Sequence, residues 1–534
     1  MIREIDKEKG ITMTEENNSS KPTKKSGFSV KLVAIIIGIL VVAGGASAYF
    51  FLGGSPKEQY FKAEIDTYDF MKEKVTDRFA NELEWSETTK DNRVATTMQA
   101  SAEYNDPYAF GGFSEIEELV NQSTVTLYSE LDMEGEKLAV DLEADIAGIS
   151  LENFTFFISG DTLYIDLPFL PDTLEIEGAD LGPLLHELDP YTFDEDEEYS
   201  FKQIFESDFG FISEDDRKYI QERYGKLFYD LLPDDAFSSD KEEVSVNGQN
   251  IKANKITLQL SEKQFKGIVK NLLRDIQEDE RLHEIMEDYF IQSAVPASEI
   301  SFFFDEFDDV LADMNEEIDD ISLPEGLSST VWIDKGLIVQ RELNYTIEDY
   351  FGDEVTVEIV GSQLLEDEEQ TLNYDIIVDD IYGTESITLD ATLKDDKGNI
   401  EDNISLSFGD ELTLFYTSDE TKDGNKHTFD RSIGLDDDFF NYALLWTGDS
   451  TFEKDRYETL HEFSLEMDDF DADMFALHLD VESELIKELT PFETEKTKNI
   501  GKMDEMELFD YFFYDVEEHF TDWMIENFGD FLYY

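Results

Sequence analysis

The pattern of apolar and polar positions divides the chain into one uninterrupted apolar run, several amphipathic helices and many alternating strands. The apolar run extends from Leu32 to Leu52 and holds 21 residues without a charge. At about 1.5 Å per residue, a helix of this length spans about 31 Å, enough to cross the roughly 30 Å hydrocarbon core of a bilayer. The pattern therefore predicts a transmembrane helix over Leu32–Leu52.

A second helix is predicted directly after Gly53-Gly54. Ser55 can cap it, Pro56 suits its first position, and Glu58 closes a capping box. Apolar residues then recur at helical spacing and define one face. These residues are Phe61, Ile65, Tyr68, Val75 and Phe79.

From about Arg93 the period changes to two, which is typical of strands. Turns are predicted at Glu134-Gly135 and Ser159–Asp161, and the Asn247-Gly248 dipeptide indicates a type I′ hairpin. The segment after Pro183 is predicted to be helical. This part of the chain therefore combines antiparallel strands with helices.

The clearest helical pattern follows the predicted hairpin. Ser261 and Gln264 form a capping box, and one face of the helix is apolar (Phe265, Ile268, Val269, Leu272, Leu273, Ile276). The opposite face is basic in an otherwise acidic protein (Lys263, Lys266, Lys270, Arg274). We interpret this face as a solvated surface balanced by nearby acidic residues, with a docking patch as the alternative.

The order of a helix followed by antiparallel strands is repeated beyond Val295-Pro296, where a helix around Phe302–Ile318 precedes a long series of strands. A helix rich in aromatic residues, Phe509–Phe528, closes the chain. The sequence therefore predicts an α+β fold, with an N-terminal transmembrane helix followed by two modules of helices packed on large antiparallel β-sheets. The predicted ranges are 1–31 for a cytoplasmic tail, 32–52 for the transmembrane helix, and 53–295 and 296–534 for two extracytoplasmic modules.

The orientation of the apolar run follows from the lysines beside it. Four lysines precede it within fifteen residues and two follow, so the positive-inside rule places the N-terminus in the cytoplasm. The predicted location is the cell membrane, with a single span and an extracytoplasmic bulk. The alternative is a secreted acidic protein cleaved after Ala48, because Ala46-Ser47-Ala48 resembles a signal-peptidase site.

The amino-acid composition limits the kinds of partner that the protein can bind. The 534 residues include no cysteine, which excludes disulfides and thiolate metal sites. The formal net charge of −86 opposes binding to nucleic acid or to anionic headgroups. The partners that remain are the membrane through Leu32–Leu52, cations, lipid and basic envelope components.

The segment from Ile149 to Pro190 carries a resemblance. Its strand–turn–strand run to Leu167–Leu170 and its Leu181–His186 stretch resemble an uncharacterised family of single-pass, membrane-anchored extracytoplasmic proteins of low-GC Gram-positive bacteria. That resemblance implies no catalytic residue. The pattern of helices with a broad antiparallel sheet is also remotely similar to the LolA/LppX-type lipoprotein and lipid carriers.

Motifs that carry catalytic chemistry are missing from the sequence. None of the six histidines lies in H-E-x-x-H, and no phosphate-binding glycine loop is present. Gly448–Ser450 weakly resembles the motif around a hydrolase nucleophile, but we predict a turn there. The sequence therefore predicts a protein that is not an enzyme, with no catalytic, cofactor-binding or metal-ligating residue.

Two acidic features need separate treatment. Asp419–Asp430 nearly matches a calcium loop but lacks the required third-position ligand and the final Glu, so we predict a hairpin turn at Asp423-Gly424. Asp395–Asn399 is predicted to be another turn. Asp194–Glu198 and Asp436–Asp438 could bind cations loosely.

The functional prediction is a binding or scaffold protein of the cell envelope. One version of it holds an apolar ligand between the sheet and the helices. The alternatives are the secreted acidic protein and a hydrolase without a recognisable motif.

Overall fold

The structure is a computed structural model. It describes residues 54–105, 114–189, 193, 199–206, 212–293, 295, 297–348, 352–437, 440–467, 472–494 and 496–529. The predicted anchor Leu32–Leu52 and the acidic segment Asp194–Glu198 lie outside the described residues.

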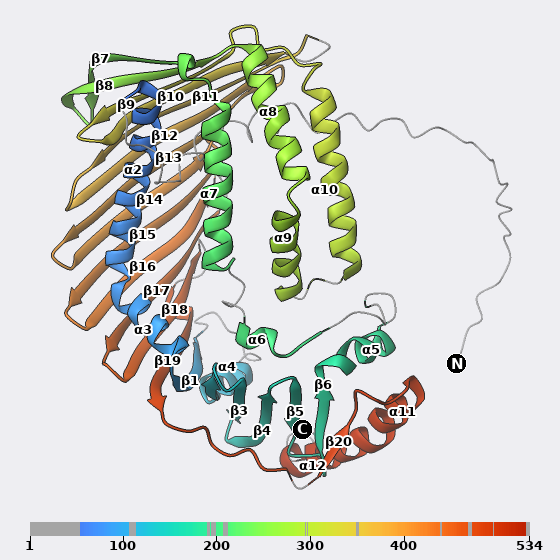
Figure 1. Cartoon of the computed structure of the whole chain (residues 1–534). Helices are drawn as coiled ribbons and strands as arrows, with labels where there is room; N and C mark the ends of the chain where they lie inside the picture. Colours follow the sequence, from blue (N-terminus) through green and yellow to red (C-terminus); the bar gives the residue numbers. More distant parts are fainter. Residues whose placement is uncertain are drawn as a thin grey trace, which may run out of the picture.

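Within those residues, twenty strands form one sheet, which curves around the helices (Figure 1). The strands follow one another from one edge to the other in the order β7 (Phe237–Val246), β8 (Gln249–Leu260), β9 (Leu327–Asp334), β10 (Leu337–Glu348), β11 (Glu354–Leu365), β12 (Glu369–Asp380), β13 (Gly383–Asp396), β14 (Asn399–Phe408), β15 (Leu412–Asp423), β16 (Lys426–Asp437), β17 (Asn441–Phe452), β18 (Arg456–Met467), β19 (Phe475–Ile486), β1 (Arg93–Tyr104), β2 (Thr124–Asp132), β3 (Lys137–Ile146), β4 (Ile149–Ser159), β5 (Thr162–Asp166), β6 (Thr173–Glu177) and β20 (Thr497–Asn499).

Most of this sheet is a meander of hairpins between consecutive strands. The exception that joins its two parts is β1, which pairs antiparallel with β19 on one side and with β2 on the other. At the far edge, β20 pairs with β6 in parallel. Strands distant in sequence therefore lie side by side in the middle of the sheet.

The helices lie on one side of this sheet and at its ends (Figure 1). They are α2 (Pro56–Arg78), α3 (Ala80–Lys90), α4 (Ser114–Asn121), α5 (Gly178–Leu188), α6 (Gln203–Glu206), α7 (Glu214–Leu231), α8 (Glu262–Gln277), α9 (Glu280–Gln292), α10 (Ala297–Glu317), α11 (Glu505–Asp510) and α12 (Glu517–Phe528), with short turns η1 (Asp234–Ala236) and η2 (Ala472–Met474) and a π-helical turn η3 (Tyr511–Val516). The C-terminal helix predicted over Phe509–Phe528 is confirmed as part of one continuous helical run, in which the π-helical turn η3 lies between α11 and α12.

Helix α2 begins where the sequence predicts. The side chain of Ser55 accepts a hydrogen bond from the Glu58 backbone, and the capping box is complete. The predicted apolar face is only partly correct. Phe61 and Ile65 are buried, whereas Tyr68, Val75 and Phe79 are 41–49% exposed, because the second half of α2 lies away from the main core.

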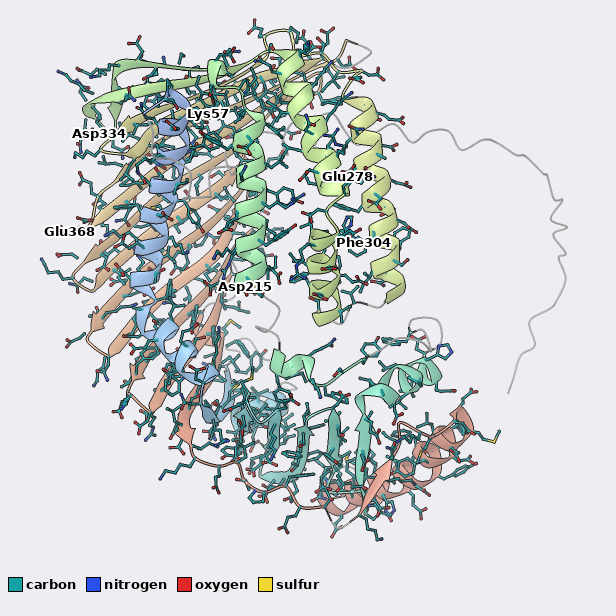
Figure 2. The ribbon with its side chains drawn as sticks, viewed as in Figure 1. Lys57, Asp215, Glu278, Phe304, Asp334 and Glu368 are labelled. Atoms are coloured by element: carbon teal, nitrogen blue, oxygen red, sulfur yellow. The ribbon has the colours of Figure 1, made fainter. Side chains whose placement is uncertain are left out.

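The largest core lies at the β7–β12 end of the sheet, between the strands and helices α2, α7 and α8. Lys57, labelled in Figure 2, is tied to the C-terminus of α7 there. Its ammonium group donates to the Leu232 carbonyl at 2.6 Å and lies 4.1 Å from the centre of the Tyr229 ring. Deeper in the core, Arg341 of β10 pairs with Glu64 of α2 at 2.6 Å, and each side chain is 8% exposed. These polar contacts orient α2 across the strands.

The sheet corrects the predicted fold class. Two modules with separate sheets are wrong, because β8 pairs with β9 and β1 pairs with β19 across the predicted boundary at Val295-Pro296. A local pattern reveals strands but not partners far away in the sequence. The ranges 53–295 and 296–534 stay predictions as folding units.

The predicted Asn247-Gly248 turn and the predicted cap of α8 are confirmed. Asn247 and Gly248 have φ of 47° and 76° between β7 and β8, as a type I′ turn requires. Helix α8 has its capping box, and its basic face is balanced by acids, since Lys266 pairs with Glu262 and Lys270 with Asp319.

Candidate functional site

One face of the sheet is apolar along nearly its whole width. We call it the inner face, since α2 and α3 lie against it. In antiparallel pairs, directly opposite residues point to the same side. The pairings Leu414–Leu435, Ile433–Leu444 and Leu444–Leu465 therefore continue one apolar surface from strand to strand.

Part of this inner face is uncovered. Eight large apolar side chains on β14–β19, β1 and β2 are 36–43% exposed, and we call them the apolar strip. At a spacing of about 4.8 Å, eight adjacent strands span about 34 Å. The apolar strip consists of Met98, Val125, Phe408, Leu414, Ile433, Tyr442, Leu465 and Leu477.

The opposite, outer face of the same strands is acidic. Asp419 faces Asp430 across β15 and β16, and Asp480 lies on β19. The sheet therefore separates charge from apolar surface, as alternation with a period of two dictates.

A buried polar cluster lies between α3 and the inner face of β15 and β16. Glu420 of β15 accepts from Arg431 Nε at 2.8 Å, and its other oxygen lies 2.7 Å from His427 Nε2. The second ring nitrogen of His427 lies 3.1 Å from Glu82 of α3. His427 is 1% exposed, and Glu420 and Arg431 are 6% and 8% exposed.

Aromatic rings enclose this polar cluster on the strand side. The Arg431 guanidinium lies 4.3 Å from the centre of the Phe429 ring and 4.6 Å from that of Trp446. Trp446 donates to His461 Nδ1 at 3.1 Å, so that nitrogen is unprotonated. Thr459 lies 3.2 Å from His461 Nε2.

The pKa values follow from these contacts. Burial alone would raise the pKa of Glu420, but hydrogen bonds from His427 and Arg431 lower it to about 2. Burial alone would lower the pKa of His427, but its hydrogen bonds to Glu420 and Glu82 raise it above the usual value. For His461, burial and the charge of Arg431 lower the pKa, which suits a neutral acceptor.

Chemically, the cluster is an ion-paired support rather than a reactive centre. Both oxygens of Glu420 accept hydrogen bonds, and the ring nitrogens of His427 face two carboxylates. The cluster joins α3 to β15 and β16, six residues along each strand from Leu414 and Ile433 of the apolar strip. The sequence signal for it was a run of polar residues at inner-face positions, Ser418, Glu420 and Lys422, within an otherwise apolar alternation.

The predicted chemical features occupy other places. Asp419–Asp430 is the β15–β16 hairpin, with Gly424 at a φ of 64°, and Lys397-Gly398 forms the turn between β13 and β14. The turn predicted at Gly448–Ser450 is wrong, because those residues lie inside β17, where Ser450 bonds to Thr459 at 2.8 Å. Among the described residues, no group of three or more His, Asp or Glu could hold a metal ion.

Comparisons with known proteins give weak likenesses only. No family model and no curated protein matches the chain. Among solved structures, Wzi, an outer-membrane protein involved in group 1 capsule assembly in Escherichia coli, is 7% identical, with a TM-score of 0.23, over 80% of this chain and 89% of that one. A BenF-like porin from Pseudomonas fluorescens Pf-5 is 7% identical, with a TM-score of 0.24, over 74% and 97%. At such scores these likenesses assign no activity.

The predicted location is corrected. In the part of the chain that the structure describes, no helix is long and apolar enough to cross a membrane. We therefore do not retain the single-pass assignment, and the low-GC Gram-positive source, which was predicted together with it, is dropped as well. The resemblance to the uncharacterised family stays a prediction.

Proposed function

We propose that the protein is a binding protein that holds an apolar ligand, such as an acyl chain, against the inner face of its sheet. The observation that carries this proposal is the apolar strip. Monomeric proteins rarely leave a contiguous apolar surface of this kind open to water unless it binds something. A ligand gains about 0.8 kcal/mol for each methylene that it buries.

The charge distribution supports an acyl chain on this face. The outer face of the same strands is acidic. An apolar ligand therefore binds to the inner face. The buried polar cluster holds α3 against β15 and β16 six residues along the strands from Leu414 and Ile433, so α3 lies beside the apolar strip and leaves it uncovered.

The test is native mass spectrometry of the full-length protein combined with titration of a fluorescent fatty acid. We expect a reproducible adduct of lipid mass and saturable binding. Leu465→Glu places a charge in the apolar strip and should weaken binding at least fivefold. A bare protein that the added fatty acid leaves unshifted would refute the proposal.

A matched control lies on the same strand. Leu460 of β18 is 49% exposed but points to the outer face. Leu460→Glu should therefore leave the affinity within about twofold of the unmodified protein. Equal losses in the two variants would mean that the sheet, rather than its inner face, responds to the added charge.

A further inference from the structure

A second apolar surface lies away from the sheet, on the C-terminal helices. A groove of about 690 Å³ runs between the end of α5 and the helices α11, η3 and α12. Its apolar lining includes Leu188, Met506, Phe509 and Phe513, which are 62%, 73%, 58% and 52% exposed. Ligand pockets of about 300–1,000 Å³ have this size.

The helix geometry explains why these side chains face outward. Leu508 and Tyr511 are buried against Leu174 and Ile176 of β6. One face of the α11–η3 segment is therefore packed against the sheet. Met506, Phe509 and Phe513 follow at spacings of three and four residues on another face, and the last two rings stack at 5.2 Å. The π-helical turn at Tyr511–Val516 is a rare geometry that often occurs at functional sites.

The rim of the groove is negative. Glu187, Glu505 and Glu517 line it, and no ion pair joins them to a Lys or Arg within the described ranges. From Met503 to Phe528 the chain has nine acidic residues and neither Lys nor Arg. An apolar floor with an anionic rim complements a ligand that is apolar on one side and cationic on the other.

We propose that this groove binds a basic amphipathic peptide, which places its apolar side chains on Met506, Phe509 and Phe513. An amphipathic helix in an apolar groove presents anchors at spacings of three and four residues. Its Lys or Arg side chains then lie beside Glu187, Glu505 and Glu517. The same charges oppose an anionic lipid surface.

The test uses the full-length protein and a 14-residue amphipathic peptide of Lys and Leu. We expect saturable binding that weakens as salt rises, because the rim charges are screened. A scrambled peptide of the same composition and a Glu/Leu peptide should bind at least tenfold more weakly. Placed in the Lys/Leu peptide, a photoreactive benzophenone should label Met506.

Two variants separate the floor from the rim. Met506→Ser with Phe513→Ser should weaken binding at least tenfold. Glu505→Lys with Glu517→Lys should do the same and should improve binding of the Glu/Leu peptide. Glu466→Lys with Asp480→Lys, two exposed changes on the outer face of the sheet, alters the net charge equally and should leave binding within twofold.

Three outcomes would overturn the proposal. The first is equal weakening by the outer-face variant, which would make the attraction a property of the net charge. The second is self-association through the groove without peptide binding. The third is binding of anionic vesicles that the Met506→Ser, Phe513→Ser variant loses.

Discussion

At the scale of single residues, His427 and Glu420 make stability depend on pH in opposite directions. Hydrogen bonds to Glu420 and Glu82 raise the pKa of His427 above 6.5, so its contribution is complete below pH 6.5 and is lost as pH rises through the folded value. The pKa of Glu420 falls from 4.5 to about 2, so its contribution is complete above pH 4.5 and is lost toward pH 2.

We therefore expect the cluster to stabilise the fold most between about pH 4.5 and 6.5. The measurement is the melting temperature from pH 4 to 9. His427→Gln should reduce the fall in melting temperature above pH 6.5, whereas the exposed His519→Gln should follow the unmodified protein. A His427→Gln profile parallel to that of the unmodified protein would contradict the assignment.

Around these residues, the sequence predicted the hairpin but not the buried polar cluster. The alternation around Asp419–Asp430 was enough to reject a calcium loop and to predict the hairpin. It did not reveal the buried cluster, because Glu82 is some 340 residues away from Glu420 and His427 in the sequence. A contact between α3 and β16 depends on the whole sheet, not on local spacing.

At the scale of elements, two glycines have opposite roles. Gly448 lies in the middle of β17, where a Cβ would stand 2.6 Å from the Phe429 ring and 2.2 Å from the Leu460 carbonyl oxygen. Gly267 lies inside α8 with nothing within 4 Å of a Cβ. The strand therefore uses the missing side chain for close packing, and the helix does not.

Gly448→Ala should therefore lower the free energy of unfolding by about 1–3 kcal/mol, through overpacking. Gly267→Ala should raise it by about 0.5–1 kcal/mol, because alanine is the better helix former. Urea denaturation of both variants checks the signs. A Gly448→Ala protein as stable as the unmodified one would mean that both the Phe429 ring and the Leu460 backbone move aside at no cost.

Strands and turns were the elements that the sequence predicted best, since alternation and dipeptides such as Asn247-Gly248 are local. The apolar face of α2 was predicted too long, because Tyr68, Val75 and Phe79 repeat at helical spacing although little covers them. Periodicity identifies a face but not what packs on it. The sequence predicted an apolar ligand between the sheet and the helices, but it did not identify the residues of the apolar strip.

At the scale of the whole molecule, the two predicted halves share one sheet. Strand β8 pairs with β9, and β1 pairs with β19, so each half supplies neighbours that the other lacks. Exposed edges of this kind expose unpaired backbone groups. Independent stability of either half would need those edges to be covered.

We therefore expect fragments 53–295 and 296–534 to lack cooperative unfolding when produced separately, and to regain it when co-expressed. Thermal unfolding followed by near-ultraviolet circular dichroism measures this. Fragment 53–240, which ends inside β7, serves as a control that should fail to assemble with 296–534. Cooperative melting of 296–534 alone would show that the predicted boundary separates two folding units.

The place of β1 between β19 and β2 also has a consequence in time. Some 370 residues separate Tyr104 at the end of β1 from Phe475, its first partner in β19. At about 5–20 residues per second, a ribosome needs about 20–70 s to deliver that partner after β1 has emerged. Throughout that interval β1 has β2 on one side and an open edge on the other. A helper that shields open edges during synthesis would therefore be most valuable to this strand.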